Sequence, residues 1–355
     1  MREALQQKID KSITLLRKAE ALALKYDPQD GFYLAFSGGK DSQALYHIAK
    51  LAGVRFKAHM NATSIDPAEV IRFVRSQYPD VEIIAPKQSI YNLAVQKGIL
   101  PTQNIRWCCA ELKETAGAGK VTLIGIRHEE STKRSKRKEV EISHHKFKGD
   151  MERFEEWQKE QTAKIIKRMA KKLPKNTNFD EFSINQESTV KCVNGKDSIL
   201  ISPIIEWTVR DVWEFLNEVV KIPHCSLYDN GHRRIGCILC PMCSKREKRR
   251  DMKEHPHVVH KWKQAIRDMR RRGGGQTDET IEFNRQFEVL TLNHRERNTG
   301  VFSESPACDT AGITEEEENE IIENIFDWWI SGKSYEKWYA DKFLQQKINF
   351  EIWNE

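Results

Sequence analysis

The sequence predicts an α/β fold, namely a parallel, twisted sheet with helices on both faces, followed by a helical C-terminal region. Short apolar runs alternate with segments of helical periodicity over about 100 residues, a pattern typical of parallel strands joined by right-handed crossovers. The first apolar run ends in a Gly-Gly turn that leads directly into a helical pattern. Beyond residue 244 the readable periodicity is helical.

The domain organisation follows from length and composition. The 355 residues suffice for two domains of about 150 residues each. We expect an N-terminal helix within residues 1–28 and an α/β domain over 29–243. A basic helical insertion is expected inside that domain at about 145–198, where a basic helical pattern is followed by polar, turn-rich sequence. Residues 244–355 are expected to be mostly helical.

The individual elements are predicted from periodicity and capping residues. Apolar residues at helical spacing predict a helix over 3–25, and an aromatic-rich run between Asp27-Pro28 and the Gly-Gly turn predicts a strand over 31–36. Thr208 and Thr314 are placed as N-caps of two later helices. The remaining predicted strands are 55–61, 81–85, 120–127 and 199–206, and the remaining predicted helices are 41–51, 67–77, 89–96, 109–115, 151–173, 209–220, 244–272 and one after Thr314.

Composition excludes several classes of protein. No run of about 18 apolar residues is present, so we expect no membrane span. The N-terminal residues contain no apolar segment and no cleavage signature, so we expect a cytoplasmic protein rather than a secreted one. Its eight cysteines are then expected to be thiols or metal ligands rather than disulfides.

Positive charge is concentrated in two segments. Residues 131–175 contain 15 Lys/Arg against 7 Asp/Glu, and residues 244–272 contain 12 against 4. The net charge of the chain is +6. Two basic segments favour a polyanionic partner such as DNA or RNA. Two solvated helix faces would give the same composition, and the sequence alone leaves both interpretations open.

The Gly-Gly turn has the residue types of a phosphate-binding loop. Two glycines let the backbone turn sharply and bring N–H groups close to an anion. The helix that follows directs its positive dipole end toward the same anion. A tight turn alone would not require the lysine, aspartate and serines that surround the glycines. The spacing differs from that of a Walker A motif. The loop residues are Ser37, Gly38, Gly39, Lys40, Asp41 and Ser42.

The cysteine spacing predicts a metal site. Cys237, Cys240 and Cys243 form a CxxCxxC run, whose spacing suits zinc or an iron–sulfur cluster. The adjacent pair Cys108-Cys109 would complete a four-thiolate site with Cys237 and Cys240. The alternative is a zinc knuckle from the CxxCxxC run plus one further thiol, Cys225 or Cys192. Whether Cys243 is a ligand stays open. By default, the single cysteines are small buried hydrophobic residues.

Five ordered blocks of sequence resemble the phosphoadenosine phosphosulfate (PAPS) reductase family of the PP-loop ATP pyrophosphatase superfamily. They cover roughly residues 30–243. The blocks are SGGKDS at 37–42, Trp107-Cys108-Cys109 through Lys113, Gly125-Ile126-Arg127 through Ser131 and Arg134, Pro203 through Trp207-Thr208 and Asp211-Val212-Trp213, and Ile222-Pro223 through Leu227-Tyr228-Asp229-Asn230-Gly231 to Ile235-Gly236-Cys237 and Cys240.

The resemblance implies an adenine nucleotide as ligand, with Mg²⁺ accompanying ATP, and a role for each matching residue. It implies that guanidinium groups hold phosphate or sulfate oxygens, which suits their bidentate geometry. It also implies a 4Fe–4S cluster on Cys108, Cys109, Cys237 and Cys240, with zinc as the alternative. The implied catalytic residues are Lys40, Asp41 and Arg127. The implied nucleotide-binding residues are Ser37, Gly38, Gly39, Lys40, Asp41, Ser42, Gly125, Arg127, Ser131 and Arg134.

Two departures from the sulfonucleotide reductases bear on function. Their loop is degenerate, because their substrates lack a β,γ-pyrophosphate, whereas this loop is intact, as in relatives that cleave ATP. Their nucleophilic cysteine lies in a Glu-Cys-Gly-Leu-His setting near the C-terminus, and Cys308 in Pro-Ala-Cys-Asp is a poor match. We therefore expect ATP cleavage to AMP and pyrophosphate.

The expected function is iron–sulfur-dependent sulfur transfer, with a sulfur-donor protein as partner. A nucleic acid is a candidate acceptor, since the chain resembles the iron–sulfur ATP pyrophosphatases of DNA phosphorothioation. The first alternative is a PAPS or adenylyl-sulfate reductase that uses thioredoxin. The second is a nucleic-acid-binding regulator that keeps the fold without turnover.

Overall fold

The computed structural model describes residues 2–114, 116–143, 198–272 and 314–344. Its contacts divide the chain into two compact units. The sheet unit comprises Met1–Asn61, Ala68–Ile84 and Glu114–Ile235, and the helical unit comprises Ala62–Pro67, Ala85–Lys113 and Gly236–Glu355. The domains expected from the sequence are continuous ranges that meet near residue 243. The two observed units instead each combine segments that are separate in the sequence. Two segments from the N-terminal half thus belong with the C-terminal helices.

The sheet unit contains a mostly parallel six-stranded sheet, as the sequence predicts. The strand order is β3-β2-β1-β4-β6-β5, and only the edge pair β5–β6 is antiparallel among the described strands. The edge strand β5 was not expected, because its sequence lies inside the basic segment. The strands are β1 (Phe32–Ala35), β2 (Phe56–Asn61), β3 (Glu82–Ile84), β4 (Val121–Leu123), β5 (Val140–Ser143) and β6 (Ser198–Ile201).

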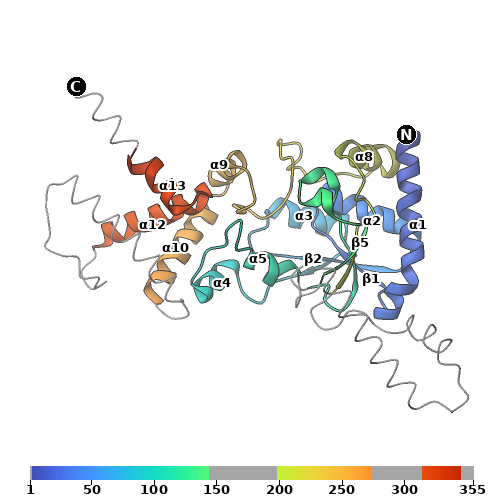
Figure 1. The fold of residues 1–355 in the computed structure, drawn as a ribbon, viewed down its shortest axis with the longest axis horizontal. Coiled ribbons are helices and arrows are strands. Elements are labelled where there is room, and N and C mark those ends of the chain that lie inside the picture. The colour runs from blue at the N-terminus through green and yellow to red at the C-terminus, as the bar shows by residue number, and fades with distance from the viewer. Residues whose placement is uncertain (1, 115, 144–197, 273–313, 345–355) are drawn as a thin grey trace, which may run out of the picture. The chain divides into compact units, whose positions relative to one another are not determined.

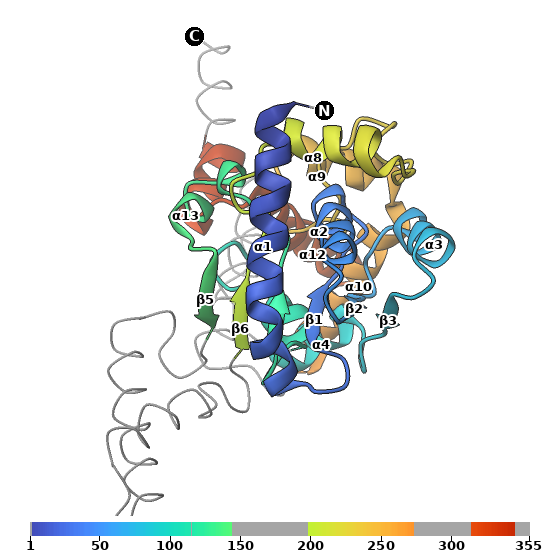
Figure 2. The same ribbon diagram turned by 90° about the vertical axis from the view of Figure 1, so that its right-hand side faces the viewer.

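Helices α1 (Glu3–Tyr26) and α2 (Lys40–Ala52) pack along each other, and α1 also contacts β1 and β4 (Figure 2). The apolar stripe of α1 explains this packing, since Leu5 and Leu16 are completely buried. The core beneath is completed by α3 (Ala68–Gln77), α8 (Val209–Glu214) and the π-helix η4 (Phe215–Val220). Thr208 caps α8 in a capping box with Asp211, as predicted.

The helical unit has its own core around α10 (Pro256–Arg272), which packs against α4 (Ile90–Lys97), α9 (Lys245–Glu254) and α12 (Glu315–Ser331) (Figure 1). Trp262 and Trp329 meet in this core with ring centroids 4.7 Å apart. The helical C-terminal region is thus confirmed within the described residues. The remaining helices are α5 (Trp107–Cys109), the π-helix η1 (Ala110–Glu114), α13 (Tyr335–Tyr339) and the π-helix η6 (Ala340–Leu344).

Several predicted elements differ in extent. The helix expected over 244–272 is divided at His255, because Pro256 excludes its predecessor from helical geometry. The strands expected over 120–127 and 199–206 end early, at Leu123 and Ile201. The helix expected over 151–173 lies outside the described residues. None of the described helices is long and apolar enough to cross a membrane.

Candidate active site

The loop predicted to bind phosphate lies where the strand order reverses. The loop follows β1, and the chain runs outward from β1 to β2 and β3 before it returns to β4 on the other side of β1. In parallel sheets, such a reversal opens a crevice at the carboxyl ends of the two strands, and ligands bind there. Gly125, shortly after β4, and Lys40, the first residue of α2, both lie at this edge.

Hydrogen bonds within the loop hold its shape. The Ser42 hydroxyl donates to the carbonyl of Gly39 at 2.8 Å and accepts from the backbone N–H of Ser37 at 3.2 Å. The side-chain amide of Gln43 donates to the carbonyl of Gly38 at 3.1 Å. Gly38 adopts a left-handed φ of +71°, and a Cβ there would lie 2.8 Å from the side chain of Val70. A side chain at residue 38 would therefore be strained by both its backbone and its neighbour.

Gly125 lets the end of β4 approach the start of α2. A Cβ at this position would lie 3.0 Å from the carbonyl oxygen of Asp41 and 3.3 Å from the backbone nitrogen of Ser42. Any larger residue would push the two segments apart. The glycine predicted from the family pattern thus has a packing reason in this structure.

A hollow of about 160 Å³ opens between these segments. It is small beside the roughly 300–1,000 Å³ of typical cofactor pockets, so it suits phosphate groups rather than a whole nucleotide. Its wall contains three cations and two carboxylates. The polar side chains that line it are those of Ser37, Lys40, Asp41, Ser42, Glu130, Arg134, Tyr228 and Arg234.

The three cations differ in their partners. The ammonium of Lys40 lies 3.0 Å from a carboxylate oxygen of Asp41, and Arg134 forms an ion pair with Glu130. The third cation, Arg234, is exposed at the hollow. Within the residues that the structure describes, no carboxylate lies within ion-pair distance of its guanidinium. Arg234 is therefore the cation most available to an incoming anion.

The hydroxyl of Tyr228 contacts the N-terminus of α2. Its hydroxyl oxygen accepts a 2.8 Å hydrogen bond from the backbone N–H of Lys40. Burial raises the pKa of Tyr228, so that the phenol is neutral and keeps its hydrogen. The residue thus satisfies a helix N–H that has no partner within the helix, and its own O–H can donate to a phosphate oxygen.

Arg127 does not line the hollow. Its side chain is buried, and its Nε donates to Oδ1 of Asp41 at 2.7 Å. Its Nη1 donates to a carboxylate oxygen of Glu129 at 2.9 Å and to the carbonyl of Trp207 at 3.3 Å. Ser131 is exposed and accepts from the N–H of Arg134 at 3.2 Å, also outside the hollow. Of the residues predicted to bind nucleotide, Arg127, Ser131 and Gly38 are the three that do not line the hollow.

Three polar lining residues were not singled out as site residues from the sequence, namely Glu130, Tyr228 and Arg234. Tyr228 lies inside one of the family-like blocks, so the pattern contained a signal for it. Arg234 lies next to Arg233 in a polar loop, and no spacing distinguishes the two. Only the folded loop shows that Arg234 lines the hollow and Arg233 does not.

The cysteines of the predicted metal site lie together in the helical unit. The Sγ atom of Cys237 lies 3.3 Å from the hydroxyl of Thr63 and 3.3 Å from the ammonium of Lys113. The pKa of Cys108 is raised by its hydrogen bond with Cys109 and by burial, and further by Cys240 and Cys237. The four predicted ligands are therefore close enough to influence one another electrostatically.

Two of these thiols are disposed to ionise. The hydrogen bond from Cys108 lowers the pKa of Cys109 to about 5, and the one from Cys243 lowers the pKa of Cys240 to about 6. Burial raises the pKa of Cys237. Because metals bind thiolates, Cys109 and Cys240 are chemically suited to ligation at neutral pH.

As placed, the cysteine side chains do not surround one metal position. No group of three or more His, Cys, Asp or Glu side chains in the described part of the chain is arranged to hold a metal ion. The donor set, with four thiols in one neighbourhood, nevertheless matches the ligands that iron–sulfur clusters take. For the zinc alternative, Cys225 is buried in the core of the sheet unit, and Cys192 lies outside the described residues, as does Cys308.

The two helices of the basic segment 244–272 differ in charge pairing. On α10, Arg267 and Arg271 approach Glu318 of α12 at 3.5 and 2.9 Å, and Lys263 pairs with Glu323. On α9, Lys248 is buried and Arg250 lies 4.0 Å from Glu254. Its four other basic side chains are exposed, and no carboxylate of the described residues lies within ion-pair distance of those four. These α9 residues, named here the α9 basic face, are Lys245, Arg246, Arg249 and Lys253. Residues 144–175 of the other basic segment lie outside the described residues.

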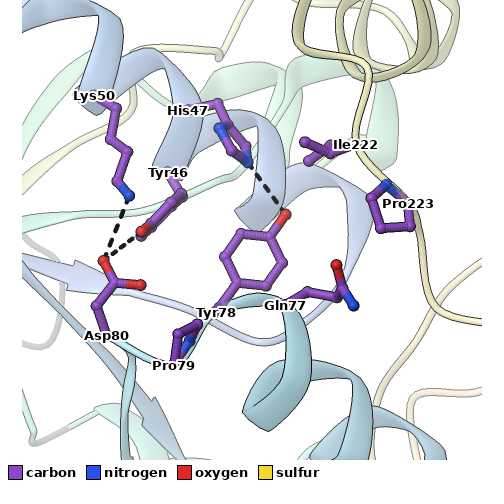
Figure 3. Close-up of a pocket in the computed structure, with 9 residues that line it drawn as sticks. All are labelled: Tyr46, His47, Lys50, Gln77, Tyr78, Pro79, Asp80, Ile222 and Pro223. Atoms are coloured by element: carbon purple, nitrogen blue, oxygen red, sulfur yellow. Dashed lines mark hydrogen bonds and ion pairs between the residues drawn. The ribbon is translucent and has the colours of Figure 1, made fainter.

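A second hollow of the sheet unit, about 420 Å³ in volume, is lined by polar groups that bind one another. Figure 3 shows Tyr46 and Lys50 directed toward Asp80, and the ring of His47 directed toward the hydroxyl of Tyr78. The His47–Tyr78 distance is 3.2 Å. Because these groups satisfy one another, we interpret this hollow as structural.

Comparison with known proteins identifies relatives of the greater part of the chain. Residues 31–243 match the phosphoadenosine phosphosulfate reductase domain family. Two uncharacterized proteins of Methanocaldococcus jannaschii are 25% and 23% identical over 244 and 247 residues. Each alignment covers 66% of this chain, but only 47% and 41% of those proteins, so the chain spans less than half the length of these relatives.

Two further matches have assigned names. An adenosine 5'-phosphosulfate reductase of Lysinibacillus sphaericus is 25% identical over 180 residues, which are 48% of this chain and 55% of that protein. The crystal structure of phosphoadenylyl-sulfate (PAPS) reductase from Candida auris, in a phosphate complex, aligns with 63% of this chain and 93% of its own. The identity is 15% and the TM-score is 0.34.

Proposed function

Because this chain belongs to the phosphoadenosine phosphosulfate reductase family, we propose that it is a PP-loop enzyme that cleaves ATP to AMP and pyrophosphate. The cleavage would activate an acceptor for iron–sulfur-dependent sulfur transfer. The observation that carries the proposal is the set of groups around one small hollow, namely the intact loop, the N-terminus of α2 and three cations.

These groups suit the departure of pyrophosphate. An acceptor oxygen would attack the α-phosphorus of ATP, the bond from the α-phosphorus to its bridging oxygen would break, and pyrophosphate would leave with the electron pair. Backbone N–H groups of the loop, Lys40 and Arg234 would stabilise the charge that builds on the leaving group. Tyr228 would donate its O–H to a phosphate oxygen. The carboxylates of Asp41 and Glu130 would hold Mg²⁺, which would offset the negative charge of the phosphates.

Arg127 has a positioning role in this scheme. Its guanidinium holds Asp41, the residue next to Lys40, and does not face the hollow. The carboxylate of Asp41 is thereby fixed between two cations, Arg127 and Lys40. A fixed carboxylate at the start of α2 would place both Mg²⁺ and the lysine for the transition state.

The sulfur-transfer step would follow from the activated acceptor. A sulfur nucleophile would attack the acceptor atom that bears the adenylated oxygen. The bond from that atom to the oxygen would break and AMP would leave with the oxygen, so that sulfur replaces oxygen in the product. Cys108, Cys109, Cys237 and Cys240 would hold a 4Fe–4S cluster, which supplies iron–sulfur redox chemistry when bound. The α9 basic face favours a nucleic acid as acceptor, as in DNA phosphorothioation, with a separate protein as sulfur donor.

The test is the identity of the nucleotide product. Anaerobically purified protein is incubated with ATP, Mg²⁺ and DNA or RNA, and the products are separated by anion-exchange chromatography. AMP and pyrophosphate in equal amounts are expected. ADP would contradict the proposal, because it reports cleavage at the γ-phosphate. Lys40→Ala should slow turnover by about two to three orders of magnitude, as loss of a preorganised donor does elsewhere. Lys50→Ala, an exposed lysine at the other end of α2, is the control.

A sulfonucleotide reductase is the second candidate, favoured by the similarity to a protein named adenosine 5'-phosphosulfate reductase. That activity would release sulfite from adenosine 5'-phosphosulfate or PAPS in the presence of thioredoxin, and ATP would be inert. A third candidate, a nucleic-acid-binding regulator on the same fold, would bind DNA or RNA and turn over neither nucleotide. The same chromatographic assay with each nucleotide separates the three.

A further inference from the structure

A large hollow in the helical unit is unrelated to the phosphate loop. Its volume is about 510 Å³, within the range of roughly 300–1,000 Å³ in which proteins bind small molecules. Leu100, Met269, Ile325, Trp328 and Trp329 give it a mostly apolar wall. Such a wall favours the aliphatic or aromatic body of an organic ligand.

Two charged side chains, Lys248 and Lys333, interrupt this apolar wall, and Lys333 is paired with Asp341. Lys248 of α9 lines the hollow, yet only 3% of its surface is exposed to solvent. Its Nζ donates a 3.2 Å hydrogen bond to the carbonyl of Ile330, in the last turn of α12. Within the described ranges, no carboxylate lies within ion-pair distance of this ammonium. A buried cation thus faces an apolar hollow without a carboxylate counter-ion from those residues. The thiols of Cys243 and Cys240 favour its charge, but burial outweighs their effect.

Capping of α12 explains only part of this arrangement. A lysine near a helix C-terminus stabilises the unpaired carbonyls there, and the bond to Ile330 does so here. An ammonium has three hydrogens, however, and this bond uses one of them. Buried charges in proteins are usually paired, because removal of an isolated charge from water is costly. Burial accordingly lowers the pKa of Lys248, and a bound anion would offset that cost.

We propose that this hollow is a binding site for an organic anion with an apolar body and a carboxylate head group. The carboxylate accepts from Lys248, and the body lies against Leu100, Ile325 and the two tryptophans. The size of the hollow suits a medium-chain fatty acid or an arylalkyl carboxylate. This site lies wholly within the helical unit, so it stands or falls independently of the proposed nucleotide chemistry.

The test compares two ligands that differ only in the head group. Decanoate and 1-decanol are titrated into the full chain, and binding is followed by calorimetry and by the fluorescence of the tryptophans. Decanoate should bind one per chain and more tightly than decanol by about tenfold or more, since a hydrogen bond to a charged group contributes about 1.5–3 kcal/mol. Lys248→Met should abolish this preference and leave decanol binding unchanged. Lys245→Met, on the exposed face of the same helix, should change neither.

A second variant keeps the test valid if Lys248→Met does not fold. Ile105 lines the hollow but is 47% exposed, so an aspartate there should be tolerated. Ile105→Asp should weaken decanoate binding by repulsion and affect decanol less. Ile84→Asp, at an exposed isoleucine of β3, is the matched control. Equal affinity for decanoate and decanol in the wild-type chain, or no saturable binding of decanoate, would overturn the proposal.

Discussion

Arg127 and Asp41 form a buried ion pair beneath the phosphate loop, with Nε and Oδ1 2.7 Å apart. Only 2% of the arginine side chain is exposed, against 21% for the aspartate. The arginine follows β4, and the aspartate is the second residue of α2, so the pair joins the two segments that form the hollow. The sequence motif predicted that Arg127 contacts phosphate, whereas its hydrogen bond to Asp41 favours a role in holding the loop in place.

Arg127→Ala should therefore destabilise the fold as well as reduce activity. Removal of the arginine leaves Asp41 with Lys40 as its cation and leaves the half-exposed Glu129 without this ion pair. The cost should therefore be about 1–3 kcal/mol, below that of an isolated buried charge. The free energy of unfolding, measured by urea titration, should fall by about that amount. Arg127→Lys should recover part of it. A variant with wild-type stability and no nucleotide binding would instead indicate direct phosphate contact.

Arg234→Ala should weaken nucleotide binding without loss of stability. This arginine is exposed and lines the hollow, so its removal takes away a charge-assisted contact but no packing. We expect KM for ATP to rise by about tenfold or more. The adjacent Arg233→Ala is the control, since Arg233 is equally exposed but does not line the hollow. Equal effects of the two substitutions would show that only overall charge matters.

Iron analysis tests the cysteine assignment. The anaerobically purified chain should contain about four iron atoms, and Cys237→Ala or Cys109→Ala should remove most of them. Cys243→Ala should leave the iron content unchanged. One zinc per chain without iron would contradict the cluster, and loss of iron in Cys243→Ala would make that residue a ligand.

The α9 basic face should account for the salt dependence of nucleic acid binding. Removal of each side chain that binds a phosphate should flatten the slope of log K against log salt by about 0.7–0.9. Substitution of all four residues of this face by alanine should reduce the slope by several times that amount. The four residues are Lys245, Arg246, Arg249 and Lys253. Arg271→Ala should not, because Arg271 is paired with Glu318. No binding to DNA or RNA at low salt would exclude a nucleic acid acceptor.

His47 should make the stability of the sheet unit pH-dependent in mild acid. Burial lowers the pKa of His47 to about 4 from an ordinary 6.5. Between these values the unfolded chain binds the proton more readily than the folded one, so the free energy of unfolding should fall as the pH drops from 6.5 toward 4. His47→Gln should reduce this dependence. Urea midpoints at pH 7.5 and 5 provide the comparison, and an unchanged difference between them would contradict the assignment.

The sheet and its loop could be predicted because they depend on local patterns. Apolar runs, the Gly-Gly turn and capping threonines are readable in short windows, and β1, α2 and α8 form near the predicted positions. The edge strand β5 could not be predicted, since it has only four residues beside a basic run and its pairing with β6 is a long-range event. The prediction of a single helix over 244–272 did not take into account that Pro256 disfavours helical geometry at His255.

Partners of charged side chains were the least predictable features. The basic composition of α10 indicated a polyanion, but two carboxylates of α12, Glu318 and Glu323, pair with several of those charges. Similarly, the motif around Arg127 identified an important arginine without revealing that carboxylates of Asp41 and Glu129 surround it. Sequence spacing records which residues occur, whereas their partners depend on segments that meet only after folding.

The internal hydrogen bonds of the loop have a kinetic consequence. Ser37, Gly39 and Ser42 satisfy one another, and Tyr228 already accepts the N–H of Lys40, so the loop keeps its form with no anion bound. A phosphate that binds there would not have to order the loop, because the loop is already ordered by folding. After product release, the loop would likewise remain in its binding conformation. Successive catalytic cycles would therefore begin without a refolding step, and loop order should not limit the steady-state rate.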